Sequence, residues 1–488
     1  MRNSMKKSRD RISELPDEVV DTILCLLPKK DAMRTSILSK RWTNLWKSTC
    51  RHATFFDFGK EFSQDKTEEQ FAASVNKCLH LHRGHSIAKF RLYFSIGEQY
   101  RADLEKWIEF ATSEGVRELD LTLCRVTENR FMELPAILFS CSSFINLSLR
   151  CIVFKPPSRF TGFGSLQTLL LNQVRITDEV LESFISNCPT LTNLCLRSCY
   201  SLSCIKLSSP SLKCFSFIVT DADEIEIIAP NLKSLHFYGD ILIGDGNEAY
   251  YFENVDALED FFINANGYEC TEPEHDFIKI ISGVSHVKIL TICIGALTFT
   301  TLAENYNLGA LPIALPNLEE LQILIGGQIR EEYLGYLFNF FRHIVCPSLD
   351  KIFIDLSGSY APPPQDVEPA DVPLSCVFSN LKTIKINQFR GTGPEIKMLK
   401  FFLQRASALE LIVLVAASDS PPVEDTSIVR NGGRTPHSEK SMLPLLDELA
   451  ALPKSSSDVQ ILLFDHGEVD TSLSPVHRHT DYYLDDIP

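Results

Sequence analysis

"LTNLCLRSC", residues Leu191 to Cys199, carries the apolar pattern from which the fold can be predicted. Leu194 and Leu196 are separated by one residue, and successive side chains of a strand point to opposite faces, so both leucines are predicted to face a core. Leu191 is predicted to help close the preceding turn, while Arg197 faces the other way. A strand of this kind cannot bury its apolar face alone, so it needs neighbours of the same kind.

The same pattern, apolar-x-x-apolar-x-apolar, recurs along most of the chain. Its copies begin at Ile87, Val116, Phe144, Leu166, Leu191, Leu212, Leu232, Leu258, Val287, Leu318, Leu349, Leu381 and Leu409. Successive copies start about 20 to 32 residues apart, near and slightly beyond the period of leucine-rich repeats. The sequence therefore predicts an α/β fold, a curved leucine-rich-repeat solenoid with a parallel sheet on its inner face.

The segments between the strands carry the signals of helices and loops. Residues 177–189 (TDEVLESFISNCP) place apolar side chains at helical spacing behind two acidic residues, which predicts a helix on the outer face. Residues 357–373 and 418–441 are rich in Pro, Gly and charge, and are predicted to be surface loops. Residues 467–488 form an acidic tail.

Composition excludes several classes of function. The net charge of −16 disfavours nucleic acid as a partner, because phosphate binding needs clustered Lys and Arg. The first residues lead into no apolar segment of a secretory signal, and no apolar run approaches the length of a membrane span. We therefore expect no membrane association and a cytoplasmic or nuclear location, or both.

No catalytic, cofactor or metal site is predicted. The chain has no glycine-rich phosphate loop, no G-x-S-x-G and no H-E-x-x-H, so we expect a protein that is not an enzyme. The 15 cysteines never fall in C-x-x-C spacing and are expected to be reduced thiols. Cys195, Cys199 and Cys204 allow a metal hypothesis, but Cys199 stands where this repeat usually carries Asn or Cys, which favours a structural role.

The N-terminal residues Leu15 to Trp46 have a different pattern. One stripe of an amphipathic helix that Pro28 ends carries Val20, Ile23, Leu24 and Leu27, and two further short helices are predicted behind it. Three short helices in so few residues cannot bury all this apolar surface. Domains this small usually need metal, disulfides or a partner, and the first two are not encoded. A protein partner is therefore implied.

These residues resemble the plant-type F-box. The resemblance is carried by Leu15-Pro16-Asp17-Glu18, Ile23-Leu24, Leu27-Pro28, Lys30-Asp31-Ala32, Thr35-Ser36, Leu38-Ser39-Lys40-Arg41-Trp42 and Leu45-Trp46. The remainder resembles the leucine-rich-repeat and FBD-like parts of plant F-box proteins, the latter around residues 381–415. The expected organisation is a flexible N-terminus (1–10), a three-helix F-box (11–50), the solenoid (51–375), FBD-like repeats (376–466) and the tail (467–488).

The resemblance implies a substrate-recognition subunit of a Skp-cullin-F-box ubiquitin ligase. Such proteins bind a Skp-type adaptor through the F-box, reach the cullin indirectly and hold a target protein with the repeats. The adaptor-binding residues are then expected to be Leu15, Pro16, Asp17, Ile23, Leu24, Leu27, Leu38, Ser39, Trp42 and Trp46. Two alternatives remain open: the tryptophans merely fill a helical subdomain, or the protein is a scaffold or regulator that acts without ubiquitylation of a target.

Target binding is expected on the inner face of the sheet. The residues that alternate with the buried ones mix charged, amide and aromatic groups, as protein-binding surfaces do. Arginine and aromatic residues dominate binding energy most often, which selects Arg150, Arg197, His236, Tyr238 and Phe262. The alternatives are a solvated polar face without a ligand, or a target that binds the loops at 357–373 and 418–441.

Overall fold

The computed structural model divides the chain into two compact units. Unit 1 comprises residues 1–212 and 220–222, and unit 2 comprises residues 213–219 and 223–488. The structure describes residues 15–16, 19–20, 23–24, 27, 31, 34–38, 42, 50, 53–64, 66–83, 87–94, 97–123, 131–157, 160, 163–218, 222, 224–240, 250–266, 280–298, 313–357, 377–417, 449, 451–464 and 474–475. The N-terminal segment 1–10, the loop predicted at 418–441, and most of the loop at 357–373 and of the tail lie outside these residues.

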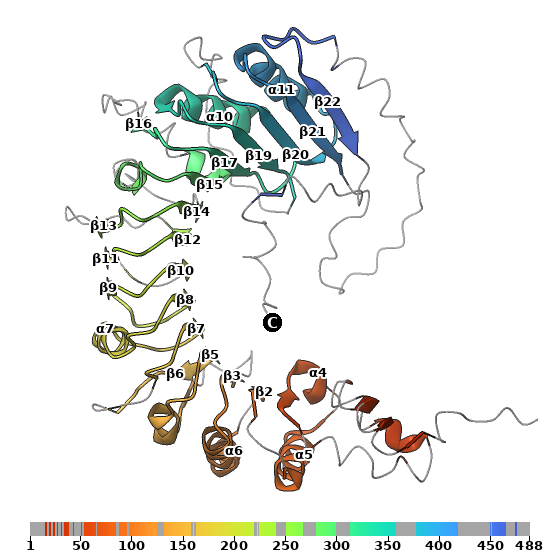
Figure 1. The fold of residues 1–488 in the computed structure, drawn as a ribbon, viewed down its shortest axis with the longest axis vertical. Coiled ribbons are helices and arrows are strands. Elements are labelled where there is room, and N and C mark those ends of the chain that lie inside the picture. The colour runs from red at the N-terminus through yellow and green to blue at the C-terminus, as the bar shows by residue number, and fades with distance from the viewer. Residues whose placement is uncertain are drawn as a thin grey trace, which may run out of the picture. The chain divides into compact units, whose positions relative to one another are not determined.

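Unit 1 is built on a parallel sheet to which each repeat adds one strand (Figure 1). Its strands are β1 (Phe55–Phe58), β2 (Lys89–Tyr93), β3 (Glu118–Thr122), β5 (Asn146–Arg150), β7 (Thr168–Asn172) and β8 (Asn193–Arg197). Each strand pairs in parallel with the next, and β7 and β8 align Leu169 with Leu194 and Leu171 with Leu196. This one-strand-per-repeat stacking confirms the predicted solenoid.

The shorter elements of unit 1 lie between these strands. They are η1 (Thr35–Ile37), α4 (Lys60–Ser63), α5 (Glu68–Leu81), η2 (Glu98–Tyr100), α6 (Arg101–Ser113), β4 (Met132–Glu133), η3 (Ala136–Ser140), β6 (Ile152–Val153), α7 (Asp178–Ser186) and β9 (Cys204–Ser208). The helix α7 lies within residues 177–189, where the sequence pattern predicts a helix. Strands β4 and β6 pair in parallel.

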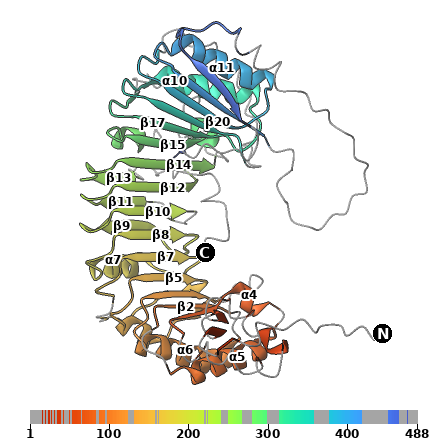
Figure 2. The same ribbon diagram turned by 45° about the vertical axis from the view of Figure 1, so that its right-hand side comes forward.

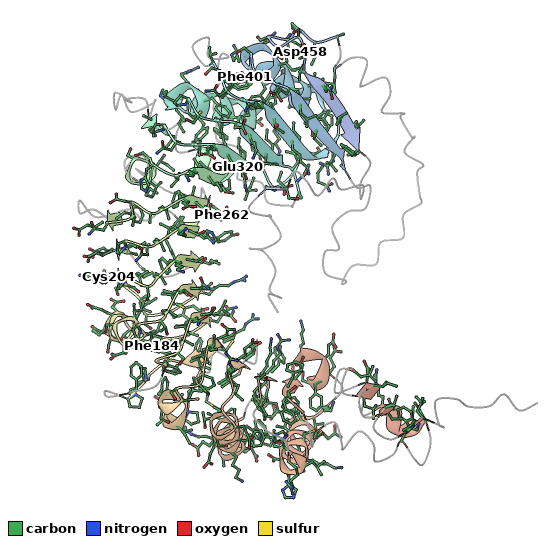
Figure 3. The ribbon with its side chains drawn as sticks, in the orientation of Figure 1. Phe184, Cys204, Phe262, Glu320, Phe401 and Asp458 are labelled. Carbon is green, nitrogen blue, oxygen red and sulfur yellow. The ribbon has the colours of Figure 1, made fainter. Side chains whose placement is uncertain are left out.

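The core of unit 1 lies between the sheet and these helices. Leu194 and Leu196 expose 1% and 0% of their surface, as the alternation predicts. Phe184 of α7 packs against phenylalanines from the preceding repeats, with a ring distance of 5.0 Å to Phe154 and 5.5 Å to Phe163 (Figure 3). Large aromatic side chains from successive repeats therefore fill the space that a single repeat leaves open.

Unit 2 has the same architecture and is likewise built on parallel strands. Its strands are β10 (Cys214–Ile218), β12 (Ser234–Asp240), β14 (Asp260–Asn266), β15 (Ile289–Cys293), β17 (Glu320–Leu324), β19 (Lys351–Asp355), β20 (Thr383–Phe389), β21 (Leu411–Ala416) and β22 (Gln460–Phe464). All neighbours in this order pair in parallel. Two outer pairs accompany the sheet, β11 (Glu224–Ile228) with β13 (Tyr250–Glu253) and β16 (Ile313–Ala314) with β18 (Ile344–Val345).

Helices α10 (Glu331–His343) and α11 (Gly393–Arg405) cover one face of the sheet in unit 2 (Figure 2). Phe338 of α10 and Phe401 of α11 lie 4.6 Å apart between ring centroids. The ion pair between Glu331 and Lys397, 2.7 Å, joins the same two helices at their exposed side. Aromatic side chains thus join these two helices, as they join successive repeats in unit 1.

The first turn of α11 holds a buried carboxylate. Glu395 exposes none of its surface, and its Oε2 accepts backbone N–H bonds from Thr392 at 2.8 Å and Arg390 at 3.0 Å. Burial raises the pKa of Glu395, and these backbone hydrogen bonds only partly oppose the increase. The carboxylate of Glu395 therefore caps the first turn of α11, although burial disfavours its ionised form.

We expect Glu395→Gln to remove a pH dependence from the stability of α11. Because the folded pKa lies above the unfolded value, the folded state holds more protons between the two values, and stability falls as pH rises through that window. The wild type should therefore gain stability relative to E395Q as pH falls toward the ordinary glutamate pKa of 4.5. Amide hydrogen exchange of α11 measures this difference. Glu410→Gln, at an exposed position, should show no such trend, and a trend of opposite sign for E395Q would contradict the assignment.

Candidate functional site

The described N-terminal residues form a small helical cluster with a core of its own. Val20, Leu24 and Trp42 expose 0%, 1% and 4% of their surface, and Leu15 and Leu27 pack against them. Val20, Leu24 and Leu27 belong to the predicted apolar stripe, and this part of the stripe faces inward, whereas Ile23 of the same stripe is exposed. Trp42 joins the helices as a core residue.

The same cluster also presents apolar side chains to solvent. Ile37 exposes 85% of its surface and Leu38 exposes 64%. Val19 and Ile23, one helical turn apart, expose 43% and 39%. Exposed large apolar residues concentrated in so short a segment are typical of protein-binding sites.

The structure separates the predicted adaptor residues into two groups. Ile23, Leu38 and Pro16 are exposed, so they remain available for a partner. Leu24 and Trp42 are buried, which corrects their assignment to the interface: they stabilise the helices that carry it. Leu15 and Leu27 are partly buried against that core. Asp17, Ser39 and Trp46 lie outside the described residues.

Two exposed residues, Val19 and Ile37, were not predicted to take part. Val19 lies four residues before Ile23, so helical spacing places both on one face, and this signal was present in the sequence. Ile37 is the last residue of η1 and precedes Leu38, where the chain leaves the helical hydrogen-bonding pattern. A short 3₁₀ turn has no long periodicity that would show which side is exposed.

The inner face of unit 1 brings Arg150 and Arg197 into one row. Register aligns Arg150 of β5 with Asn172 of β7, and Asn172 with Arg197 of β8. All three are partly exposed, as the alternation predicts. Arg150 Nε donates to Gln173 Oε1 at 3.1 Å, a bond that orients its guanidinium.

Charges on the neighbouring strands β2 and β3 are paired across the sheet. Arg91 Nε donates to Asp120 Oδ2 at 3.0 Å, and Lys89 lies 3.4 Å from Glu118. Burial raises the pKa of Asp120, while the adjacent Arg91 acts in the opposite direction. The acidic residues of this part of the face are thus held by cations of the same chain.

His236 of unit 2 is held in a polar network. Its Nδ1 lies 3.0 Å from Ser216 Oγ, and its Nε2 lies 2.7 Å from Ser234 Oγ and 3.4 Å from Asp260 Oδ2. Ser234 donates its single proton to Asp260 at 2.6 Å, so it accepts from Nε2, and Nδ1 of a neutral ring accepts from Ser216. The network fixes the ring against the sheet beside the partly exposed Tyr238.

Phe262 corrects the predicted target-binding set. Phe262 exposes 0% of its surface, and Thr291, its partner in the same row on β15, also exposes 0%. Since Phe261 is buried as well, β14 is buried on both faces. Gln322 and Lys385, which continue the row, expose 1% and 5%. A row with so little exposure offers no surface to a target, which removes Phe262 as an anchor.

Among the described residues the cysteines are buried or partly buried free thiols, with Cys151 as the exception. Burial raises the pKa of the Cys199 thiol to about 12, and its Sγ lies 3.7 Å from the Leu171 carbonyl oxygen, in keeping with a structural position. Cys151 is disulfide-bonded, so the expectation that all cysteines are reduced thiols is wrong for this residue. Within the described residues, no group of three or more His, Cys, Asp or Glu is arranged to hold a metal ion.

The described helices include none with the length and apolarity of a membrane span.

Comparison with known proteins matches two family models to this chain. Residues 12–54 match the F-box domain, and residues 78–443 match the LRR domain of At1g61320/AtMIF1. The first match covers the helical cluster with the exposed apolar residues. The second covers most of the parallel strands of both units.

Relatives from Arabidopsis thaliana combine the same parts. The F-box/FBD/LRR-repeat protein At1g13570 is 28% identical over 418 residues, which cover 84% of this chain and 92% of the relative. The FBD-associated F-box protein At4g10400 is 31% identical over 344 residues, 67% of this chain and 80% of the relative. The F-box/FBD/LRR-repeat protein At5g56420 is 26% identical over 477 residues, 94% of this chain and all of the relative. With an N-terminal F-box, a parallel repeat sheet and relatives of matching length, the chain belongs to the plant F-box/FBD/LRR-repeat family.

Proposed function

We propose that this protein is the substrate-recognition subunit of a Skp-cullin-F-box ubiquitin ligase. In this proposal the F-box binds a Skp-type adaptor, the adaptor joins the chain to a cullin, and the repeats hold a target protein. The chain itself carries out no chemistry. It raises the concentration of the target near the charged ubiquitin carrier, an effect that depends on simultaneous binding of both partners.

One observation carries the adaptor part of the proposal. Ile37 and Leu38 expose 85% and 64% of their surface although Val20, Leu24 and Trp42 already form a core beneath the same short segment. Apolar residues left outside a completed core are best explained by a partner that desolvates them.

Target binding is proposed for the inner face of the repeats. Arg150 and Arg197 of unit 1, and His236 and Tyr238 of unit 2, are the predicted anchors that retain some exposure. Arginine and tyrosine contribute strongly to binding when a partner excludes water from them.

Affinity purification from plant cells treated with a proteasome inhibitor tests the proposal. The intact chain is expected to recover a Skp-type adaptor, a cullin and ubiquitin conjugates of a further protein. A variant lacking residues 12–54 is expected to lose the adaptor, the cullin and the conjugates while it retains the further protein. Recovery of adaptor and partner without chain-dependent conjugates would favour the scaffold alternative, and no adaptor with the intact chain would overturn the proposal.

A further inference from the structure

We infer that a surface patch of unit 1, formed by Phe131, Arg175 and Tyr200, binds an acidic side chain of a protein partner. The patch lies on a short ladder beside the main sheet and not on its inner face, so the inference goes beyond the proposed function and does not depend on it. Three features carry it: a guanidinium that forms no ion pair with any described residue, aromatic rings that hold this group, and a main chain that fixes its position.

The patch stands on a short parallel ladder that follows the main strands. After β5, β7 and β8 the chain turns into this ladder at residues with positive φ, namely Cys151, Gln173 and Ser198. One row of the ladder consists of Glu133 of β4, Val153 of β6, Arg175 and Tyr200. Side chains in one row of parallel strands share a face, so these four lie on the same side. The other side faces the core, where the adjacent residues Ile152, Val174 and Cys199 are buried.

The main chain holds Arg175 and Tyr200 in place. The N–H of Arg175 donates to the carbonyl oxygen of Ile152 at 2.9 Å, and its own carbonyl oxygen accepts from the N–H of Phe154 at 2.9 Å. The N–H of Tyr200 donates to the carbonyl oxygen of Val174 at 2.8 Å. Because this backbone is already ordered, a partner that binds the two side chains has less freedom to remove.

Aromatic rings orient the guanidinium of Arg175. Its central carbon lies 4.4 Å from the centroid of the Phe131 ring, and this ring meets the ring of Tyr200 edge-on at 5.7 Å. The contact uses the flat face of the guanidinium, while its N–H donors lie in the plane of the group. Arg175 is exposed and Tyr200 exposes 37% of its surface. The donors are therefore held in position on an accessible surface.

No described carboxylate neutralises Arg175. In the part of the chain that the structure describes, its guanidinium forms no ion pair. Glu133 stands two strands away in the row, about 10 Å between Cα atoms, and exposed charges at that distance are largely screened. Asp178 accepts N–H bonds from Ser203 at 2.9 Å and Cys204 at 3.1 Å. These acids leave the positive charge of the patch available to a partner.

The patch fits a carboxylate that stands beside an apolar side chain. The N–H fork of arginine matches the two oxygens of a carboxylate, whereas phosphate recognition generally uses clusters of arginines and this row contains one. Phe131, Val153 and Tyr200 surround the guanidinium with apolar surface that a bare anion would leave unused. Arginine and tyrosine are also the residues that most often dominate binding between proteins. The expected ligand is therefore Asp or Glu next to an aromatic or aliphatic residue of a protein.

Peptide selection on the full-length protein tests the inference first. A display library of short random peptides is panned in parallel on the wild type and on R175Q. We expect peptides with Asp or Glu beside an aromatic or aliphatic residue to be enriched on the wild type and not on R175Q. The most enriched peptide is then synthesised with a fluorescent label, together with one counterpart that carries the amide in place of the acid and one that carries phosphoserine.

Fluorescence polarisation with these labelled peptides locates the contact. R175Q and the amide peptide should each weaken binding at least about tenfold, since hydrogen bonds to charged groups contribute that much. Both changes together should cost no more than one alone, because they remove the same contact. R175K should recover only part of the affinity, because lysine restores the charge and not the planar fork. R117Q changes another exposed arginine of unit 1, so it is the matched control and should bind as the wild type does.

Three results would overturn the inference. They are equal enrichment of acidic peptides on the wild type and on R175Q, additive losses from R175Q and the amide peptide, and tighter binding of the phosphoserine peptide than of the acidic peptide. None of these measurements involves the adaptor, so their outcome is independent of the proposed function.

Discussion

Replacing Leu194 or Leu196 with alanine is expected to lower the free energy of unfolding of unit 1 by about 2 to 5 kcal/mol. Both leucines expose at most 1% of their surface and lie in register with Leu169 and Leu171 of the neighbouring strand. Removal of either side chain leaves a cavity between two repeats, and each repeat depends on its neighbours for its core. The melting temperature should fall by roughly 2 to 4 °C for each kcal/mol.

Tryptophan fluorescence measures this effect selectively, because all three tryptophans of the chain belong to unit 1. The matched control is Leu38→Ala, a leucine that exposes 64% of its surface and should change stability by less than about 0.5 kcal/mol. Melting temperatures of L194A and L196A equal to that of L38A would show that the strand register is wrong.

The double substitution Ile37→Asp and Leu38→Asp is expected to abolish capture of the Skp-type adaptor. Both side chains are largely exposed, so the fold should tolerate the change, whereas a desolvated interface does not accept unpaired carboxylates. Loss of two apolar anchors of at least about 2 kcal/mol each corresponds to more than about 30-fold in affinity for each. Copurification of the adaptor with the tagged full-length chain measures the loss.

Val345→Asp provides the control for an exposed apolar residue outside the F-box. It exposes 51% of its surface in β18 and should leave adaptor recovery unchanged. Trp42→Ala is unsuited to the same purpose, because Trp42 is buried and its loss would unfold the helical cluster. Undiminished adaptor recovery by I37D/L38D would place the adaptor interface elsewhere.

The strands of the solenoid could be predicted from the sequence because their alternation is regular. Each predicted copy between Ile87 and Leu409 leads into a parallel strand, and the helix α7 follows from its apolar spacing and its acidic first turn. The F-box could be predicted because its motif is dense. These features depend on local periodicity, which a single sequence records directly.

The exposure of inner residues in unit 2 could not be predicted from the alternation rule. The rule assigns Phe262 to an exposed face, but Phe261 and Phe262 are both buried. A signal was nevertheless present: Phe262, Phe353 and Val413 stand in continuous apolar runs of their strands, and such runs are typical of strands buried on both faces. The inner row of β5 and β8 in unit 1 keeps polar residues at these positions, and there the prediction of exposure is confirmed for Arg150 and Arg197.

The orientation of the N-terminal helices was likewise beyond the sequence pattern. Helical spacing predicts that Val20, Ile23 and Leu24 share one apolar stripe, yet Ile23 is exposed and its neighbours in the stripe are buried. When the apolar stripe of a helix is wider than the core it packs against, residues at one border of the stripe stay exposed to solvent. Tertiary packing decides which border that is. The residues best placed for a partner are therefore those at the border of the stripe.

The measurement that tests the central claim most directly is a binding titration of the intact, purified chain with a purified Skp-type adaptor. We expect saturable binding of one adaptor per chain, lost in the variant without residues 12–54 and unchanged in the inner-face variant R150Q/R197Q. Absence of binding by the folded wild type, or equal binding by the variant that lacks residues 12–54, would contradict it.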